Sequence, residues 1–119
     1  MITVTPAPDI VEVPKPWRRD LWWANAEHYM RKTLEIRAGH STSLHYHQHK
    51  HETILLLACA VTVQDCDMER VLQPGDVIMI DPWAVHRIRA PQDSTLVEVS
   101  TGHRGDAVRV EDAYGRVPP

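Results

Sequence analysis

Short runs rich in Val, Ile, Leu and Thr recur along this chain, and Gly, Pro and Asp separate them at intervals of roughly 8–12 residues. Within the runs, apolar and polar positions alternate, as in strands that bury one face. No stretch has the periodicity of a long helix. The pattern predicts an all-β sandwich or barrel with strands at residues 20–24, 29–36, 42–48, 52–58, 60–64, 69–72, 76–80, 85–89 and 95–101.

Two charged residues fall within this alternation. Lys32 shares a strand face with Met30, Leu34 and Ile36, so we expect it to point inward. Glu98 lies on an alternating strand whose inward side the pattern leaves open. We take Lys32 and Glu98 as candidate catalytic groups; a structural pair at the barrel rim is an equally consistent interpretation.

The N-terminal segment differs in composition from the rest. Four prolines within residues 1–16 exclude a helix and suggest an extended arm over a neighbouring surface or another subunit. The remaining length corresponds to one domain. We therefore expect an arm at 1–16, a single domain at 17–119 and a homodimer.

The charge balance limits the possible partners. Thirteen Lys and Arg against sixteen Asp and Glu give a formal charge of -3, without the excess of basic residues typical of a nucleic-acid binder. No apolar run is long enough to span a bilayer, and the N-terminus lacks signal-peptide features. Two cysteines without a metal-binding spacing fit a reducing compartment, so we predict a cytoplasmic protein that binds neither nucleic acid nor membrane.

The chain has eight histidines, five of them between residues 40 and 51. His45 and His47 share one face of a predicted strand with Ser43, so their imidazoles can converge. Glu52 opens the next strand, and His86 follows a later turn. Three imidazoles and a carboxylate suit one divalent transition metal, with zinc, nickel, manganese and iron all admissible.

These residues lie in two stretches that resemble the motifs of the cupin superfamily. Residues 39–52 resemble the first motif, and residues 75–86 resemble the second. The sequence departs from the motifs at turns, where it has Cys59, Asp81 and Trp83. The resemblance implies a single-domain cupin, a small β-barrel or jelly roll, with a metal held by His45, His47, Glu52 and His86.

A narrower resemblance extends from residue 16 to the C-terminal tail. Pro16-Trp17, Lys32, residues 43–47, and the tail at 106–116 are similar to the cupin domain of type II phosphomannose isomerases. That family often has Gln where this chain has His45. The resemblance implies isomerisation of a sugar phosphate such as mannose 6-phosphate.

Other residues are candidates for binding a small-molecule substrate. Tyr46 and Trp83 flank metal ligands, where a ring could contact a sugar, although aromatic residues more often pack in a core. Lys50 and Arg109 could meet a phosphate, but a solvated turn and a salt-bridged tail are the commoner roles. His49 and His51 could extend the metal site or lie in an exposed hairpin.

The sequence leaves the chemistry open. In the first hypothesis a metal acts as Lewis acid in a sugar-phosphate isomerase. The same ligands would serve an iron-dependent oxygenase or a polyketide cyclase. A metal-stabilised binding module that catalyses nothing is the non-enzymatic alternative.

Overall fold

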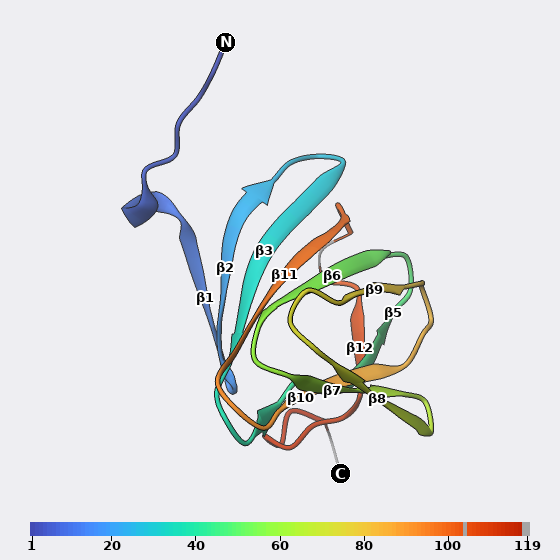
Figure 1. Ribbon diagram of the computed structural model, residues 1–119. Coiled ribbons are helices and arrows are strands. Elements are labelled where there is room, and N and C mark those ends of the chain that lie inside the picture. Colours follow the sequence, from blue (N-terminus) through green and yellow to red (C-terminus); the bar gives the residue numbers. More distant parts are fainter. Residues whose placement is uncertain (104, 118–119) are drawn as a thin grey trace.

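The computed structural model describes residues 1–103 and 105–117, which form two facing antiparallel sheets (Figure 1). The first sheet has the order β1 (Val11–Lys15), β2 (Arg18–Asn25), β3 (Tyr29–Ile36), β11 (Ser94–Thr101), β6 (Glu52–Ala58) and β9 (Val77–Ile80). The second has the order β12 (Ala107–Glu111), β5 (Leu44–His47), β10 (His86–Ala90), β7 (Val61–Asp65) and β8 (Met68–Leu72), with β4 (His40–Ser41) paired to β10. The predicted all-β fold is confirmed.

All nine predicted strands occur, with ends that differ from the prediction by two residues at most. The pattern missed β1, β4 and β12. β1 contains Pro14, which cannot donate to a strand ladder, but β1 is an edge strand and needs hydrogen bonds on one side only. The two-residue β4 is too short to show alternation.

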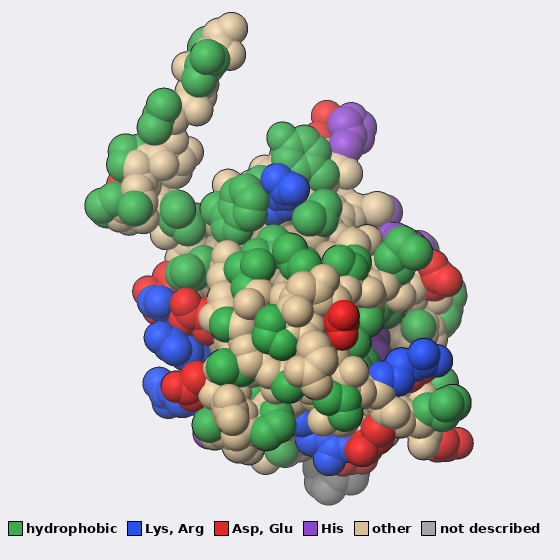
Figure 2. Space-filling view, viewed as in Figure 1, with side chains coloured by type: hydrophobic (Ala, Val, Ile, Leu, Met, Phe, Trp, Pro, Cys, Tyr) green, Lys and Arg blue, Asp and Glu red, His purple; other side chains and the backbone are tan. Residues whose placement is uncertain are grey.

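The N-terminal segment combines three conformations. Residues 1–6 project away from the body of the molecule, and this projection carries few charged side chains (Figures 1 and 2). Ala7–Asp9 form a single 3₁₀ turn, so the prediction of no helix is wrong for these three residues; proline is tolerated in a first turn. β1 then pairs with β2 of the same chain. Contact of this segment with a second copy stays a prediction.

The interior between the sheets has an apolar half and a polar half. Along β11, β6 and β10 the inward side chains change from apolar to charged or imidazole, and along β3 the charged Lys32 lies between the buried Met30 and Leu34. The inward residue changes from Leu96 to Glu98 along β11, from Ile54 to Glu52 along β6, and from Ile88 to His86 along β10. Glu98 pairs in register with Lys32 of β3, and Ser100 pairs with Glu52 of β6, so the polar side chains gather at one end of the barrel.

The apolar half supplies the hydrophobic core. Leu56, Leu96 and Val61 are completely buried in it, and Trp17 closes it at one side. Each buried Leu contributes about 1.5–3 kcal/mol of transfer free energy. The core therefore supports the strands that carry the polar side chains. No helix among the described residues is long and apolar enough to cross a membrane.

Candidate metal centre

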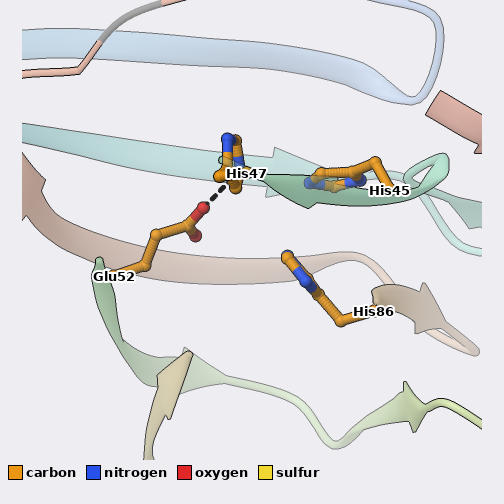
Figure 3. A group of neighbouring side chains, drawn as sticks. All are labelled: His45, His47, Glu52 and His86. Atoms are coloured by element: carbon orange, nitrogen blue, oxygen red, sulfur yellow. Dashed lines mark ion pairs between the residues drawn. The ribbon is translucent and has the colours of Figure 1, made fainter. Parts of the chain in front are cut away.

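Three histidines and a glutamate converge in the polar half of the barrel. His45 and His47 project from β5, Glu52 from the first residue of β6 and His86 from the first residue of β10. One potential ligand atom from each lies within 4.8 Å of the others. Figure 3 shows the four side chains around one point. Pairing of His86 with His45 across β10 and β5 brings the two sequence motifs together.

Hydrogen bonds at the outer nitrogens orient the three imidazoles. His45 Nδ1 donates to the Ser43 carbonyl oxygen and His86 Nδ1 to the Ala84 carbonyl oxygen, each at 2.8 Å. A carbonyl oxygen can only accept, so both rings carry their proton on Nδ1. His47 Nδ1 lies 2.8 Å from Asp106 Oδ1. Each Nε2 is thus left as the nitrogen for the interior, as in metal sites where a second partner fixes the tautomer.

The electrostatics favour ligands in their metal-binding forms. Burial, and then the neighbouring His86, lowers the pKa of His45 to about 3, and burial also lowers the pKa of His86. Burial acts to raise the pKa of Glu52, but His47 and the Lys50 ammonium outweigh it and hold that pKa well below its usual range. At neutral pH His45 and His86 are therefore neutral and Glu52 is a carboxylate, so these three groups can bind a metal without losing a proton.

One contact between two of the four residues requires a positive charge. His47 Nε2 lies 2.5 Å from Glu52 Oε1, while its Nδ1 faces Asp106. Burial acts to lower the pKa of His47, but the contact with Glu52 outweighs it and raises that pKa. Two lone pairs cannot face each other at this distance, so a proton lies between them, and a bound divalent metal would take the place of that proton. Together with the three-nitrogen, one-oxygen donor set, this contact fits a divalent transition metal.

The sequence pattern missed Asp106, which contacts His47 of the candidate centre. Its Oδ1 accepts from His47 Nδ1, and its Oδ2 accepts from the backbone N–H groups of His49 and Lys50, each at 2.9 Å. It therefore orients a potential metal ligand and orders the turn before Glu52. Nothing in the spacing links residue 106 to residue 47; the only signal is that Asp106 opens the tail similar to that of the isomerases.

A cavity of about 120 Å³ adjoins the four ligands. Its charged lining contains four of the predicted site residues, Lys32, Lys50, Glu98 and Arg109, together with Lys15 and Asp20. Tyr46 and Trp83 do not line it. Their rings stack on each other at 5.6 Å, and Trp83 is 62% exposed. The structure thus brings the predicted charged residues to the ligands but leaves the two aromatic residues outside.

Buried ion pairs link the cavity to the metal ligands. Lys32 Nζ lies 3.3 Å from Asp20 Oδ2 and 3.8 Å from Glu98 Oε2. Lys50 Nζ lies 2.9 Å from Glu98 Oε2 and 3.8 Å from Glu52 Oε1. Lys50 is only 5% exposed, so its interpretation as a solvated turn residue is wrong. The backbone around it turns at the surface, but its side chain points inward.

Burial raises the pKa of Glu98, so its carboxyl group is more basic than an exposed glutamate. Burial acts to lower the pKa of Lys32, but Glu98 and Asp20 outweigh it and raise that pKa. Glu98 is therefore a carboxylate of raised basicity, and the neighbouring Lys32 stays protonated. Shifted pKa values of this kind occur in buried structural ion pairs and in active sites.

The other histidines of the cluster lie apart from the centre. His49 is exposed, with its ring 5.8 Å from that of His103. His51 Nε2 forms an ion pair with Asp81 Oδ1 at 3.2 Å. Neither belongs to the group of four potential ligands found among the described residues.

The fold and centre define a small two-sheet β-barrel with an internal three-histidine, one-glutamate site. The family model described as "Cupin domain" matches residues 32–102, and the chain belongs to this family. The predicted cupin fold and family are thereby confirmed.

Curated relatives include two nucleotidyltransferases. Over 111 residues the chain is 30% identical to mannose-1-phosphate guanylyltransferase ManC of Salmonella typhimurium, covering 89% of this chain and 23% of that protein. It is 29% identical over 103 residues to mannose-1-phosphate guanylyltransferase of Sinorhizobium fredii, covering 82% and 20%. The chain thus spans about a fifth to a quarter of the length of these relatives.

Solved structures share the fold at low sequence identity. KdgF from Halomonas sp. superposes with a TM-score of 0.77 at 18% identity, covering 87% of this chain and 98% of that one. The polyketide cyclase RemF from Streptomyces resistomycificus superposes with a TM-score of 0.76 at 19% identity, covering 95% and 88%. These similarities establish the architecture and no particular reaction.

Proposed function

We propose that this protein is a metal-dependent isomerase of sugar phosphates, interconverting an aldose phosphate and a ketose phosphate. The observation that carries the proposal is the position of the Lys32–Glu98–Lys50 ion pairs in the same cavity as the four potential metal ligands. Similarity to two mannose-1-phosphate guanylyltransferases supports a sugar phosphate as the substrate class.

The reaction needs a proton moved between neighbouring carbons, without net oxidation. A divalent metal bound by His45, His47, Glu52 and His86 would supply a Lewis acid that polarises the carbonyl and the adjacent hydroxyl. Glu98 takes the proton from the carbon next to the carbonyl and returns it to the former carbonyl carbon. The carbonyl moves to the neighbouring carbon as the hydroxyl proton passes to the first oxygen.

The lysines beside Glu98 have a separate role. Lys32 and Lys50 are ammonium donors on either side of the carboxylate. They stabilise negative charge on a substrate oxygen as it develops, and they hold Glu98 in place when it is ionised. Exclusion of water from the cavity strengthens both interactions.

The charged lining also separates this proposal from its alternatives. A polyketide cyclase for an aromatic substrate needs an apolar, aromatic cavity, whereas three lysines and three carboxylates line this one. An iron-dependent oxygenase would use the same ligands but has no evident need for a buried carboxylate–lysine pair. A binding module would not need a group able to move a carbon-bound proton.

The test uses protein loaded separately with zinc, nickel, manganese or iron and incubated with aldose phosphates in D₂O. Proton NMR should show conversion to the ketose phosphate and deuterium at the carbon that gains the proton. Glu98→Gln should lower turnover about 10²–10⁴-fold, the range for loss of a general base, and keep its metal. Glu69→Gln is the matched control, because Glu69 is exposed and pairs with Arg89 outside the cavity.

The outcomes discriminate among the classes. Turnover by wild type and Glu69→Gln but not by metal-loaded Glu98→Gln supports the proposal. Full turnover by Glu98→Gln removes Glu98 as the base. Failure of every metal form to convert any aldose phosphate refutes the isomerase; oxygen consumption with iron alone would then identify an oxygenase.

A further inference from the structure

A second group of cations lines the cavity from two edge strands of the two sheets. β1 is an edge of the first sheet and β12 an edge of the second, and residues of both line the cavity. Lys15 lies two residues after Val13, which pairs in register with the buried Asp20, so Lys15 is on the interior face of its sheet. Arg109 pairs with His45 and therefore shares the side of β5 that faces the metal ligands.

Neither cation has a carboxylate at ion-pair distance among the described residues. Lys15 Nζ lies 5.8 Å from the centroid of the Trp17 ring, and Arg116 Cζ lies 5.1 Å from the same ring. Arg116 is already neutralised, because Asp112 accepts hydrogen bonds from its Nε and Nη2 at 2.8 and 3.0 Å. The nearby Asp20 forms its own ion pair with Lys32. Lys15 and Arg109 are thus the cations left for a ligand.

The charged side chains that line the cavity carry a net positive charge. Besides Lys15 and Arg109, the charged lining consists of Lys32, Lys50, Asp20, Glu52 and Glu98. Four cationic side chains therefore face three carboxylates, and a bound divalent metal would add further positive charge. Burial lowers the pKa of Lys15, and the positive charges of Lys32, Arg116 and Arg109 lower it further, against Asp20. A bound anion would relieve this repulsion.

We propose that Lys15 and Arg109 form an oxyanion-binding subsite that takes the phosphate group of the substrate, while the sugar end faces the metal ligands. The identity of the anion as phosphate rests on the proposed isomerase; the existence of an anion site does not. Arg109 offers a planar pair of donors to two oxygens of one group, and Lys15 offers a point charge from the opposite sheet. β1 thereby becomes part of the substrate site.

Asp20 lines the same cavity as Lys15 and Arg109. Its side chain is buried in the cavity lining, and its Oδ1 accepts no hydrogen bond from the described residues. A buried carboxylate oxygen without a donor costs free energy that a ligand hydroxyl would recover. A ligand with both an anionic group and a hydroxyl satisfies Lys15, Arg109 and Asp20 together.

The test measures binding, so that it does not depend on turnover. Metal-loaded wild type, Lys15→Met and Arg109→Met are titrated calorimetrically with a hexose 6-phosphate, the parent hexose, a hexuronate and inorganic phosphate. Methionine keeps most of the apolar volume of each side chain and removes its charge. Arg89→Met is the matched control, because Arg89 is exposed and pairs with Glu69 away from the cavity. Circular dichroism confirms that each variant is folded.

We expect both cavity variants to bind the hexose 6-phosphate about 10–100-fold more weakly, as for loss of a charge-assisted hydrogen bond, with the parent hexose and the control unaffected. If the hexuronate binds more tightly than the hexose phosphate and with the same dependence on Lys15 and Arg109, the subsite stands and phosphate as its anion is refuted, along with the proposed substrate. Unchanged binding of every anion by both variants overturns the subsite, even if wild-type protein isomerises a sugar phosphate. Absence of anion binding by wild type also overturns it.

Discussion

Replacement of Asp106 by Asn tests whether a carboxylate from the tail controls the metal centre. Asp106 accepts three hydrogen bonds, one from His47 Nδ1 and two from the backbone N–H groups before Glu52. Asparagine has the same shape but a single acceptor oxygen. If that oxygen faces the backbone, the amide group opposes the Nδ1 proton of His47; if it faces His47, both backbone donors lose their acceptor.

The magnitude follows from these contacts. Loss of an outer-shell partner of a metal-binding histidine typically weakens metal affinity about 10–100-fold. This factor corresponds to about 1.4–2.7 kcal/mol. Loss of charge-assisted hydrogen bonds should also lower the stability of the metal-free protein, by about 1.5–3 kcal/mol for each bond lost.

Competition with a chromophoric zinc chelator at neutral pH gives the affinity, and urea unfolding of metal-free protein gives the stability. Asp112→Asn is the matched control, because Asp112 is a buried tail carboxylate that pairs with Arg116 instead of a histidine. We expect Asp112→Asn to lower stability alone and Asp106→Asn to lower both quantities. Equal zinc affinity in Asp106→Asn and wild type would refute the role assigned to Asp106.

Three further predictions concern the ligands, the acid stability and the core. His47→Ala should lose bound metal in elemental analysis and the chelator-sensitive part of the melting temperature; stoichiometric metal in this variant would contradict the ligand assignment. Hydrogen bonding to Arg19 lowers the pKa of Glu35, so the stability from this carboxylate should be full above its unfolded pKa of about 4.3 and lost as the pH falls through the lower folded value. Glu35→Gln should flatten the dependence of urea unfolding on pH in that acid range, and an unaltered slope would count against the pair. Leu56→Ala should cost about 2–5 kcal/mol in the same assay, because Leu56 is completely buried; a loss below 1 kcal/mol would show that the core collapses around the missing atoms.

Strand alternation was enough to predict the parts of the site that lie on regular strands. It assigned Lys32 to the interior and placed His45 and His47 on one face, as the structure shows. For Glu98 it left the inward side open, because apolar residues occupy both faces of β11. The inward face of β11 is set by its pairing with β3 and β6, which buries Leu96 and Glu98 on the same side of the sheet.

The remaining parts depend on tertiary contacts that no local pattern contains. Lys50 lies in a turn, where alternation does not operate, and its burial follows from the ion pair with Glu98. Asp106 is 59 residues from His47, and only the pairing of β12 with β5 brings it there. Lys15 lies in a proline-rich segment whose composition concealed an edge strand.

The backbone segments that carry Glu98 and Lys50 differ in rigidity. β11 is hydrogen-bonded on both sides, to β3 and to β6, so its central amides exchange with solvent only when the first sheet opens. Lys50 lies in a turn that makes two hydrogen bonds to Asp106, donated by the backbone N–H groups of His49 and Lys50. When an incoming ligand separates this ion pair, we therefore expect the Lys50 side chain to move. The Glu98 carboxylate keeps its position on β11.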